Sequence, residues 1–276
     1  MNSVLIFDVG MHKGEDTDYY LRRGFNVVGI EANPDLAELC KIRFQDAIAR
    51  ERLHIVEGAI APSSTEKTVT FFKNTLSVWG TIDPGWSARN ASLGWESTAI
   101  TLPRVDIKDV FQRFGVPFYL KIDVEGVDLL VLDSLYNMDA RPKYVSIESD
   151  KVDFGALEAE LRTLSDLGYS RFKVVQQESI PGTTISTTTL DGRSFDYTFE
   201  RDASGPFGED IAGPWLSMSE VLEEYRRIFK RYRYFGDNSI FLKLPPRAQR
   251  PIDRLYKAVT GYRGPLPGWF DTHAAR

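Results

Sequence analysis

The sequence predicts an α/β protein with a Rossmann-like sheet, and three observations support this class. Short apolar runs that carry no charge, such as residues 4–7 and 27–30, have the pattern of buried parallel strands. Segments with a helical spacing of apolar residues alternate with these runs. Acidic residues, among them Glu31 and Asp123, stand at the ends of the runs, where open parallel sheets bind their ligands. The 276 residues, 42% of them apolar, suffice for one domain with insertions.

The N-terminal segment has the pattern of a nucleoside-binding β-α-β unit. The first apolar run leads into a turn that contains Gly10 and Gly14, and residues 16–23 continue as a short helix that Gly24 can end. The next strand-like run ends at Glu31. An acidic residue in this position, about twenty residues after a glycine turn, holds the two ribose hydroxyls of a bound nucleoside. We therefore predict that Glu31 binds ribose.

The charge of the turn indicates which nucleoside it binds. Two positions where a dinucleotide-binding motif has glycine hold His12 and Glu15. Glu15, Asp16 and Asp18 also place negative charge at the start of the helix, which repels phosphate. S-adenosylmethionine has no phosphate and carries a cationic sulfonium and an ammonium group. The turn therefore favours S-adenosylmethionine over a nicotinamide dinucleotide, although such turns also connect strands and helices without binding any ligand.

Composition and charge restrict the other classes of function. The net charge of −5 argues against a general nucleic-acid-binding protein, in which basic residues predominate or gather on one face. Cys40 is the single cysteine, so no intrachain disulfide can form and a reducing compartment is expected. The sequence shows no secretory signal and no run of about 18 apolar residues. We expect a cytoplasmic protein with no membrane partner, and the sequence does not indicate an oligomeric state.

The next elements complete the binding unit. Asn33 is a good N-cap and Pro34 a good first residue for a second helix. Residues 53–60 have the pattern of a third strand, whose end, at Gly58 and Ala59, is expected beside the adenine. Short β-like pieces separated by turn residues then predict a β-rich insertion over the site, at residues 62–103. Its tryptophans can stack on a sugar or planar substrate or fill a small core of their own, namely Trp79, Trp86 and Trp95.

A second acidic motif follows the insertion. An apolar strand over residues 118–122 ends in Asp123 and Glu125, and the next strand ends in Glu148 and Asp150. The carboxyl ends of parallel strands meet at one edge of a sheet, so these acids are expected there together. Their oxygens also suit Mg²⁺ or Ca²⁺, but nothing in the sequence fixes their convergence, and we predict no metal site. Helices are predicted over residues 106–114, 127–135 and 154–167. The strand that ends in Glu148 and Asp150 is predicted over residues 144–150.

Four segments together resemble the FkbM family of S-adenosylmethionine-dependent methyltransferases: residues 8–17, 31–34, 121–126 and 147–148. The resemblance spans residues 4–150. It implies a seven-stranded class I methyltransferase sheet, mostly parallel with an antiparallel last strand, and an enzyme that methylates hydroxyl oxygens of sugars, polyketides or other small metabolites. The chain departs from the family pattern at Met11 and His12, where Ala-Asn is more common, and at Asp128, where Glu is.

The resemblance also implies roles for individual residues. Asp8, Gly10 and Gly14 would shape the methionine end of the donor site, Glu31 would hold ribose, and Asp123 would lie near the methyl group. The whole set expected to bind S-adenosylmethionine, and its product S-adenosylhomocysteine, is Asp8, Gly10, Gly14, Thr17, Glu31, Asn33, Gly58, Ala59 and Asp123.

The second half of the chain is expected to hold the last two strands. Residues 171–176 have the pattern of the sixth strand, and residues 239–244 are predicted as the last, antiparallel one. Residues 177–238 must leave the sheet between these strands and return, and we predict that they form a lid. The methyltransferase domain would then cover residues 1–245, followed by a C-terminal helix and tail over residues 246–276.

The predicted lid contains a helix that begins at a capping box formed by Ser217 and Glu220. Basic residues form a stripe along one face of this helix. The stripe is either a face exposed to solvent or a docking surface for an anionic acceptor, such as a phosphorylated sugar or RNA. The stripe consists of Arg226, Arg227, Lys230, Arg231 and Arg233.

Methyl transfer to an alcohol gains from a general base, because a sugar or macrolide hydroxyl stays protonated near neutral pH. The candidates are His12, Asp123, Glu148 and His273, of which Asp123 and His273 rank first. The expected acceptor is a small molecule or a saccharide. The rival function is a non-catalytic module with the same fold that binds a nucleoside or a glycan.

Overall fold

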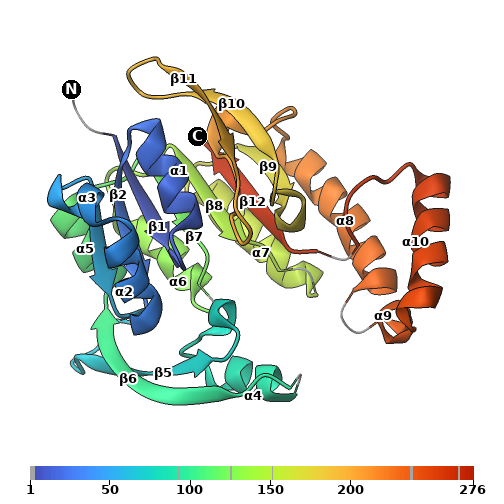
Figure 1. The fold of residues 1–276 in the computed structure, drawn as a ribbon, viewed down its shortest axis with the longest axis horizontal. Helices are drawn as coiled ribbons and strands as arrows, with labels where there is room; N and C mark the ends of the chain where they lie inside the picture. The colour runs from blue at the N-terminus through green and yellow to red at the C-terminus, as the bar shows by residue number, and fades with distance from the viewer. Residues whose placement is uncertain (1–3, 93, 125, 151, 237–238, 267) are drawn as a thin grey trace. The chain divides into compact units, whose positions relative to one another are not determined.

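The computed structural model describes residues 4–92, 94–124, 126–150, 152–236, 239–266 and 268–276. The chain divides into two compact units, a first unit of Met1–Ile147 with Thr184–Phe199 and a second unit of Glu148–Thr183 with Glu200–Arg276. The central sheet has seven strands in the order β3-β2-β1-β7-β8-β12-β9 (Figure 1). This order, with an antiparallel pair at β12 and β9, confirms the predicted class I methyltransferase sheet.

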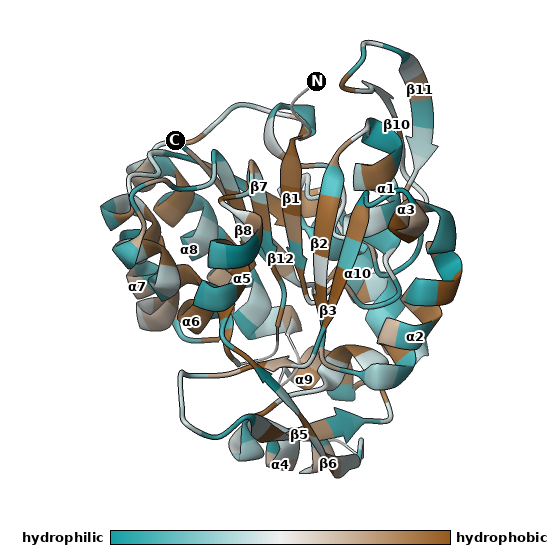
Figure 2. Cartoon of the chain, turned by 90° about the vertical axis from the view of Figure 1, so that its left-hand side faces the viewer, coloured by the Kyte–Doolittle hydropathy of each residue, from teal (hydrophilic) through white to brown (hydrophobic). Residues whose placement is uncertain are grey.

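Five parallel strands of this sheet belong to the first unit, except for Glu148, the last residue of β8. They are β1 (Leu5–Val9), β2 (Asn26–Glu31), β3 (Leu53–Glu57), β7 (Tyr119–Ile122) and β8 (Tyr144–Glu148). Most of their residues are buried, as the uncharged runs predicted, and Figure 2 colours β1 largely as hydrophobic. Asp8 of β1 stands in register with Lys121 of β7. This register brings two charged side chains together in an otherwise apolar layer.

Three helices of the first unit begin or end at a residue that the sequence indicated. Gly24, with a φ of 98°, ends α1 (Glu15–Arg23). The side chain of Asn33 accepts a hydrogen bond from the backbone N–H of Asp35 and so caps α2 (Pro34–Arg43). Asp106 caps α5 (Ile107–Phe114) in the same way. The remaining α-helices between the strands of this sheet are α3 (Gln45–Ala49) and α6 (Asp128–Asp133).

The predicted third strand is two strands in the structure. β3 stops at Glu57, and β4 (Ala59–Ile60) pairs instead with β6 (Ser97–Val105) of a smaller sheet. Gly58 lies between them with a φ of 140°, and a Cβ there would come within 2.5 Å of the Pro103 carbonyl oxygen. β6 pairs antiparallel with β5 (Thr68–Asn74), and a helix that the sequence did not indicate, α4 (Pro84–Ser92), connects the two. A small core of Ala59, Phe71 and Leu102 holds this sheet together.

A β-hairpin of β10 (Thr184–Thr188) and β11 (Ser194–Thr198) belongs to the first unit and was not predicted. The Tyr197 hydroxyl donates a hydrogen bond to Asp18 of α1 over 3.0 Å. The ring centroid of Tyr19 lies 5.0 Å from that of Tyr197 and 5.1 Å from that of Phe199. This part of the predicted lid therefore packs on α1.

In the second unit, the prediction of a last strand over residues 239–244 is wrong. Ser239 accepts a hydrogen bond from the backbone N–H of Leu242 and caps a short helix, α9 (Ile240–Lys243). The antiparallel strand is β12 (Phe270–Ala275), which pairs with β9 (Arg171–Gln176). The predicted boundary after residue 245 therefore excludes a core strand. The other helices of this unit are α7 (Phe154–Asp166), α8 (Met218–Phe235), which has the predicted capping box, and α10 (Pro246–Thr260).

The basic stripe on α8 is largely engaged within the second unit. Arg227 forms ion pairs with Glu223 and Glu224 on the same helix. The guanidinium of Arg226 lies 5.6 Å from the ring centroid of Phe154, and that of Arg231 lies 4.0 Å from the ring centroid of Tyr262. Across the described ranges, no helix combines the length and the apolar character needed to span a membrane.

Candidate functional site

The turn between β1 and α1 depends on its two glycines. Gly10 and Gly14 have φ values of 83° and 80°, in the left-handed region that other residues rarely adopt. A Cβ at Gly10 would lie 1.9 Å from the backbone oxygen of Asp123, so only glycine lets the end of β7 come this close. His12 also has a positive φ, of 52°. The turn is therefore fixed in one shape beside the carboxyl ends of β1 and β7.

Two backbone amides of this turn, those of His12 and Lys13, are already bound by carboxylates. Glu31 accepts hydrogen bonds of 2.8 Å from the N–H groups of His12 and Asn33. Glu15 accepts one of 3.1 Å from the N–H of Lys13. Burial raises the pKa of Glu31 to about 7. A pyrophosphate would have to displace these carboxylates to reach the amides.

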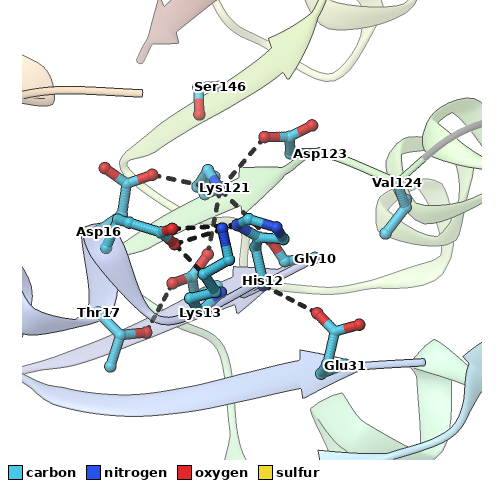
Figure 3. A network of polar contacts seen from close by, with 12 residues as sticks. Gly10, His12, Lys13, Asp16, Thr17, Glu31, Lys121, Asp123, Val124 and Ser146 are labelled. Carbon is cyan, nitrogen blue, oxygen red and sulfur yellow. Dashed lines mark hydrogen bonds and ion pairs between the residues drawn. The ribbon is translucent and has the colours of Figure 1, made fainter. Parts of the chain in front are cut away.

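Lys121 collects three carboxylates around one buried ammonium group (Figure 3). Its Nζ lies 3.4 Å from Asp8, 3.3 Å from Asp16 and 3.3 Å from Asp123, and it donates a hydrogen bond of 3.4 Å to the carbonyl oxygen of Gly10. Burial alone would lower the pKa of Lys121, but the carboxylates outweigh it and hold this pKa well above its ordinary value. One cation among three carboxylates leaves a surplus of negative charge.

Asp8 is the most deeply buried member of this group, with no solvent exposure. Burial raises its pKa to about 6, against the opposing effect of Lys121. Thr17 donates a hydrogen bond of 2.6 Å to the other carboxylate oxygen of Asp8. Lys121 belongs to one of the segments that resemble the family, but the sequence pattern did not assign it a role. A lysine inside an apolar strand was the available signal, because a buried ammonium needs anionic partners.

His12 connects the turn to the insertion. Its Nδ1 lies 3.1 Å and 3.3 Å from the two carboxylate oxygens of Glu15, and its Nε2 lies 2.8 Å from the hydroxyl of Ser77. A carboxylate only accepts hydrogen bonds, so Nδ1 carries a proton, and in the neutral imidazole Nε2 accepts from the Ser77 hydroxyl. Burial alone would raise the pKa of Glu15, but the hydrogen bond from His12 helps to hold it below its ordinary value. No sequence pattern pointed to Ser77, which lies 65 residues from His12.

The insertion also reaches the turn after β7. A Cβ added to Gly126 would lie 3.2 Å from the Cδ1 atom of Trp86, which is 38% exposed. The guanidinium of Arg89 lies 4.9 Å from the ring centroid of Trp86. The rings of Trp79 and Trp95 instead pack against each other edge to face, 6.3 Å apart. Glu125, which the sequence grouped with Asp123, lies outside the described residues.

The remaining predicted residues fall in two places. Gly58 donates a backbone hydrogen bond of 3.0 Å to the carbonyl oxygen of Glu31, so it and Ala59 adjoin the predicted ribose position. Glu148 and His273 belong to the second unit, at the end of β8 and within β12. His273 is 2% exposed, and burial lowers its pKa to about 3, so it is neutral near pH 7. The structure thus groups the predicted donor residues with His12 and Asp123 in the first unit.

Comparison with known proteins gives one family and several distant structures. A family model described as the methyltransferase FkbM domain matches residues 8–171. An S-adenosylmethionine-dependent methyltransferase from Archaeoglobus fulgidus is 10% identical, with a TM-score of 0.40 over 100% of this chain and 87% of that chain. An O-methyltransferase from Bacillus cereus in complex with SAH is 13% identical, with a TM-score of 0.35 over 70% and 71% of the two chains. These structural likenesses are too weak to add to the family match, and no curated protein matches.

Proposed function

The chain belongs to the FkbM methyltransferase family, and we propose that it transfers the methyl group of S-adenosylmethionine to a hydroxyl oxygen of a small molecule or sugar. S-adenosylmethionine is the methyl donor of the family. Methyl transfer requires residues that hold this donor and an acceptor oxygen aligned with its methyl group.

The carboxylates around Lys121 support the donor residues. Asp8, Asp16 and Asp123 all lie against the ammonium of Lys121, and the negative charge of these carboxylates favours the ammonium and sulfonium groups of the donor. We propose that Asp8, Gly10, Gly14 and Thr17 shape the methionine end. Glu31 would accept the ribose hydroxyls, because each of its oxygens has spare acceptor capacity beyond its one bond to the backbone. A dinucleotide is disfavoured, since Glu15 and Glu31 occupy the turn amides.

The observation that carries the hydroxyl acceptor is the chain of hydrogen bonds from Glu15 through His12 to Ser77. An acceptor hydroxyl that takes the place of the Ser77 hydroxyl would donate to Nε2 of His12. As the carbon–oxygen bond forms and the carbon–sulfur bond breaks, the hydroxyl proton passes to Nε2, and Glu15 stabilises the resulting imidazolium. Such a base contributes about 10²–10⁴-fold. Alignment of donor and acceptor supplies up to about 7–11 kcal/mol in favourable cases.

The other predicted bases are less well supported. Asp123 faces the ammonium of Lys121 and is better suited to hold the cationic donor. His273 lies inside a strand, where its side chain is almost fully buried. The rank order expected from the sequence, with Asp123 and His273 first, therefore gives way to His12 in this proposal.

Two measurements test the proposal. Calorimetric titration with S-adenosylmethionine, S-adenosylhomocysteine and NADH tests the donor: binding of NADH alone would overturn the donor site. A screen of sugars and hydroxylated metabolites for uptake of labelled methyl tests the acceptor. Glycan binding without methyl uptake would favour the non-catalytic module. Labelling of RNA but of no hydroxylated small molecule would favour an anionic acceptor instead.

A further inference from the structure

A hollow of about 490 Å³ lies at the amino ends of β1 and β7, within the first unit. The proposed donor site lies at the carboxyl ends of the same two strands, so the two are separated by the length of the strands. Apolar side chains and two cations line the hollow, among them Phe114, Val116, Pro117, Phe118, Arg141 and Lys143. No part of the proposed methyl transfer uses this hollow.

Phe118, one of the residues that line the hollow, is held in place by ring contacts and backbone hydrogen bonds. The ring of Phe118 stacks on Phe25 with centroids 6.2 Å apart and planes at 17°, and it meets Tyr144 edge to face at 5.4 Å. The backbone N–H of Phe118 donates to Leu5 over 2.7 Å, and that of Lys143 donates to Phe118 over 3.0 Å. Phe118 is therefore hydrogen-bonded to β1 and Lys143 to Phe118, so backbone bonds fix part of the lining before any ligand enters.

The two cations of the hollow lack anionic partners in the part of the chain that the structure describes. Arg141 has a buried Nε that meets no hydrogen-bond acceptor there. The ammonium of Lys143 lies 5.6 Å from the ring centroid of Phe118 and 5.1 Å from that of Tyr144, and these are its only described contacts of this kind. A buried donor without an acceptor is unfavourable unless a ligand or solvent supplies the oxygen.

We propose that this hollow binds an organic anion with an apolar body. Its carboxylate or phosphate would accept hydrogen bonds from Arg141 and Lys143, both of which line the hollow. Its hydrocarbon or aromatic part would cover Phe114 and Phe118. S-adenosylmethionine is disfavoured here, because its sulfonium would lie beside two cations and no carboxylate is among the residues described as lining the hollow.

The experiment is calorimetric titration of the full chain with octanoate, octyl phosphate, inorganic phosphate and octylammonium, all below the micellar range. Octanoate or octyl phosphate should bind at one site, inorganic phosphate more weakly, and octylammonium not at all. The stronger of the two octyl anions identifies a carboxylate or a phosphate ligand. S-adenosylmethionine affinity should not change when the hollow is filled, so this result is independent of the methyltransferase proposal.

Variants decide whether the cations are responsible. Arg141→Met and Lys143→Met should each weaken the octyl anion by about tenfold or more. Lys108→Met, which removes an exposed cation on α5 outside the hollow, is the matched control and should leave binding unchanged. If Arg141→Met fails to fold, Arg141→Lys keeps the charge, removes the buried Nε and should still weaken binding. Equal binding of octylammonium, no binding of either octyl anion, or binding that survives loss of both cations would overturn the proposal.

Discussion

Strands β1 and β7 have opposite electrostatic surroundings at their two ends. At the carboxyl ends, three carboxylates surround the single ammonium of Lys121. At the amino ends, Arg141 and Lys143 have no carboxylate partner within the described ranges. At the carboxyl ends the carboxylates share the ammonium of Lys121, and the surroundings stay negative. At the amino ends the cations have no carboxylate partner within the described ranges, and the surroundings stay positive. The difference suggests that the same sheet presents a site for a cationic donor and a separate site for an anion.

Removal of Lys121 should strongly destabilise the protein at the carboxyl ends of β1 and β7, which we call the acidic end. Lys121→Met removes the ammonium that three neighbouring carboxylates share, and loss of one partner from a buried ionic group costs about 3–5 kcal/mol. Urea denaturation measures the free energy of unfolding. The same substitution at the other end, Lys143→Met, removes an exposed cation and should change it by less than about 0.5 kcal/mol. Equal effects at the two ends would show that the carboxylates of the acidic end do not depend on Lys121.

His12 should separate binding from chemistry at the acidic end. His12→Gln removes the proposed base and should lower kcat by about 10²–10⁴-fold. The dissociation constant of S-adenosylmethionine should not change, because His12 contacts Glu31 through its backbone N–H. Transfer of labelled methyl to an acceptor found in the screen measures kcat. Ser77→Ala should retain activity, since it removes only the hydroxyl that the acceptor would replace; a full-rate His12→Gln enzyme would rule out this base.

Two glycines test how tightly each end is packed. Gly10 at the acidic end and Gly115 beside the hollow have φ values of 83° and 87°. A Cβ at Gly10 would meet Asp123 at 1.9 Å, whereas one at Gly115 would meet nothing within 4 Å. Gly115→Ala should therefore cost only the backbone strain of about 1–2 kcal/mol. Gly10→Ala should cost a further 1–3 kcal/mol, roughly, from overpacking. Urea denaturation curves that coincide for the two variants would contradict this packing difference.

The acidic end should also make stability depend on pH. Burial raises the pKa of Asp8 from 3.8 to about 6 and that of Glu31 from 4.5 to about 7. Between about pH 4 and pH 7 the folded state binds more protons at these groups than the unfolded state, so their contribution to the free energy of unfolding falls as pH rises. The loss is on the order of 3 kcal/mol for each group. Comparison of the wild type with Asp8→Asn across this range isolates the part due to Asp8, and a parallel pair of profiles would refute it.

The smallest effect is expected at the hollow. Without added ligand, Arg141→Met should change the melting temperature little, because it breaks no ion pair. The expected change in the free energy of unfolding is less than about 0.5 kcal/mol. Differential scanning fluorimetry measures this change. With octanoate present, the wild type should gain stability and Arg141→Met should gain less. A large loss without ligand would assign Arg141 a structural role and weaken the contrast between the two ends.

Local patterns predicted the parallel strands and several helix ends in the first half of the chain. Gly24, Asn33 and Asp106 each end or begin a helix through contacts with residues close in sequence, so their roles can be read directly. The acidic strand ends near the sheet edge follow from alternation of strands and helices. The donor residues remain a prediction, although the structure groups them with Lys121, whose role depends on the register between β1 and β7 and is invisible in either strand alone.

The errors arose where a local pattern had two solutions. Residues 239–244 are apolar enough for a strand, but Ser239 is also a good N-cap. In the structure it caps the helix α9. The true strand β12 contains Asp271, Thr272 and His273, whose polar side chains disguise a buried element. Two of these side chains have partners within the second unit: Gln177 donates a hydrogen bond to Asp271, and Thr272 shares hydrogen bonds with Ser149 and Tyr225. Such long-range pairing cannot be read from one segment.

The late position of β12 has a consequence for biosynthesis. β9 ends at Gln176, yet its antiparallel partner begins at Phe270. During translation, β9 must wait for more than ninety further residues to leave the ribosome, which at about 5–20 residues per second takes several seconds. Through that interval the nascent chain exposes an unpaired strand, and a chaperone that shields such edges would be expected to raise the yield of native protein more than one that acts after release.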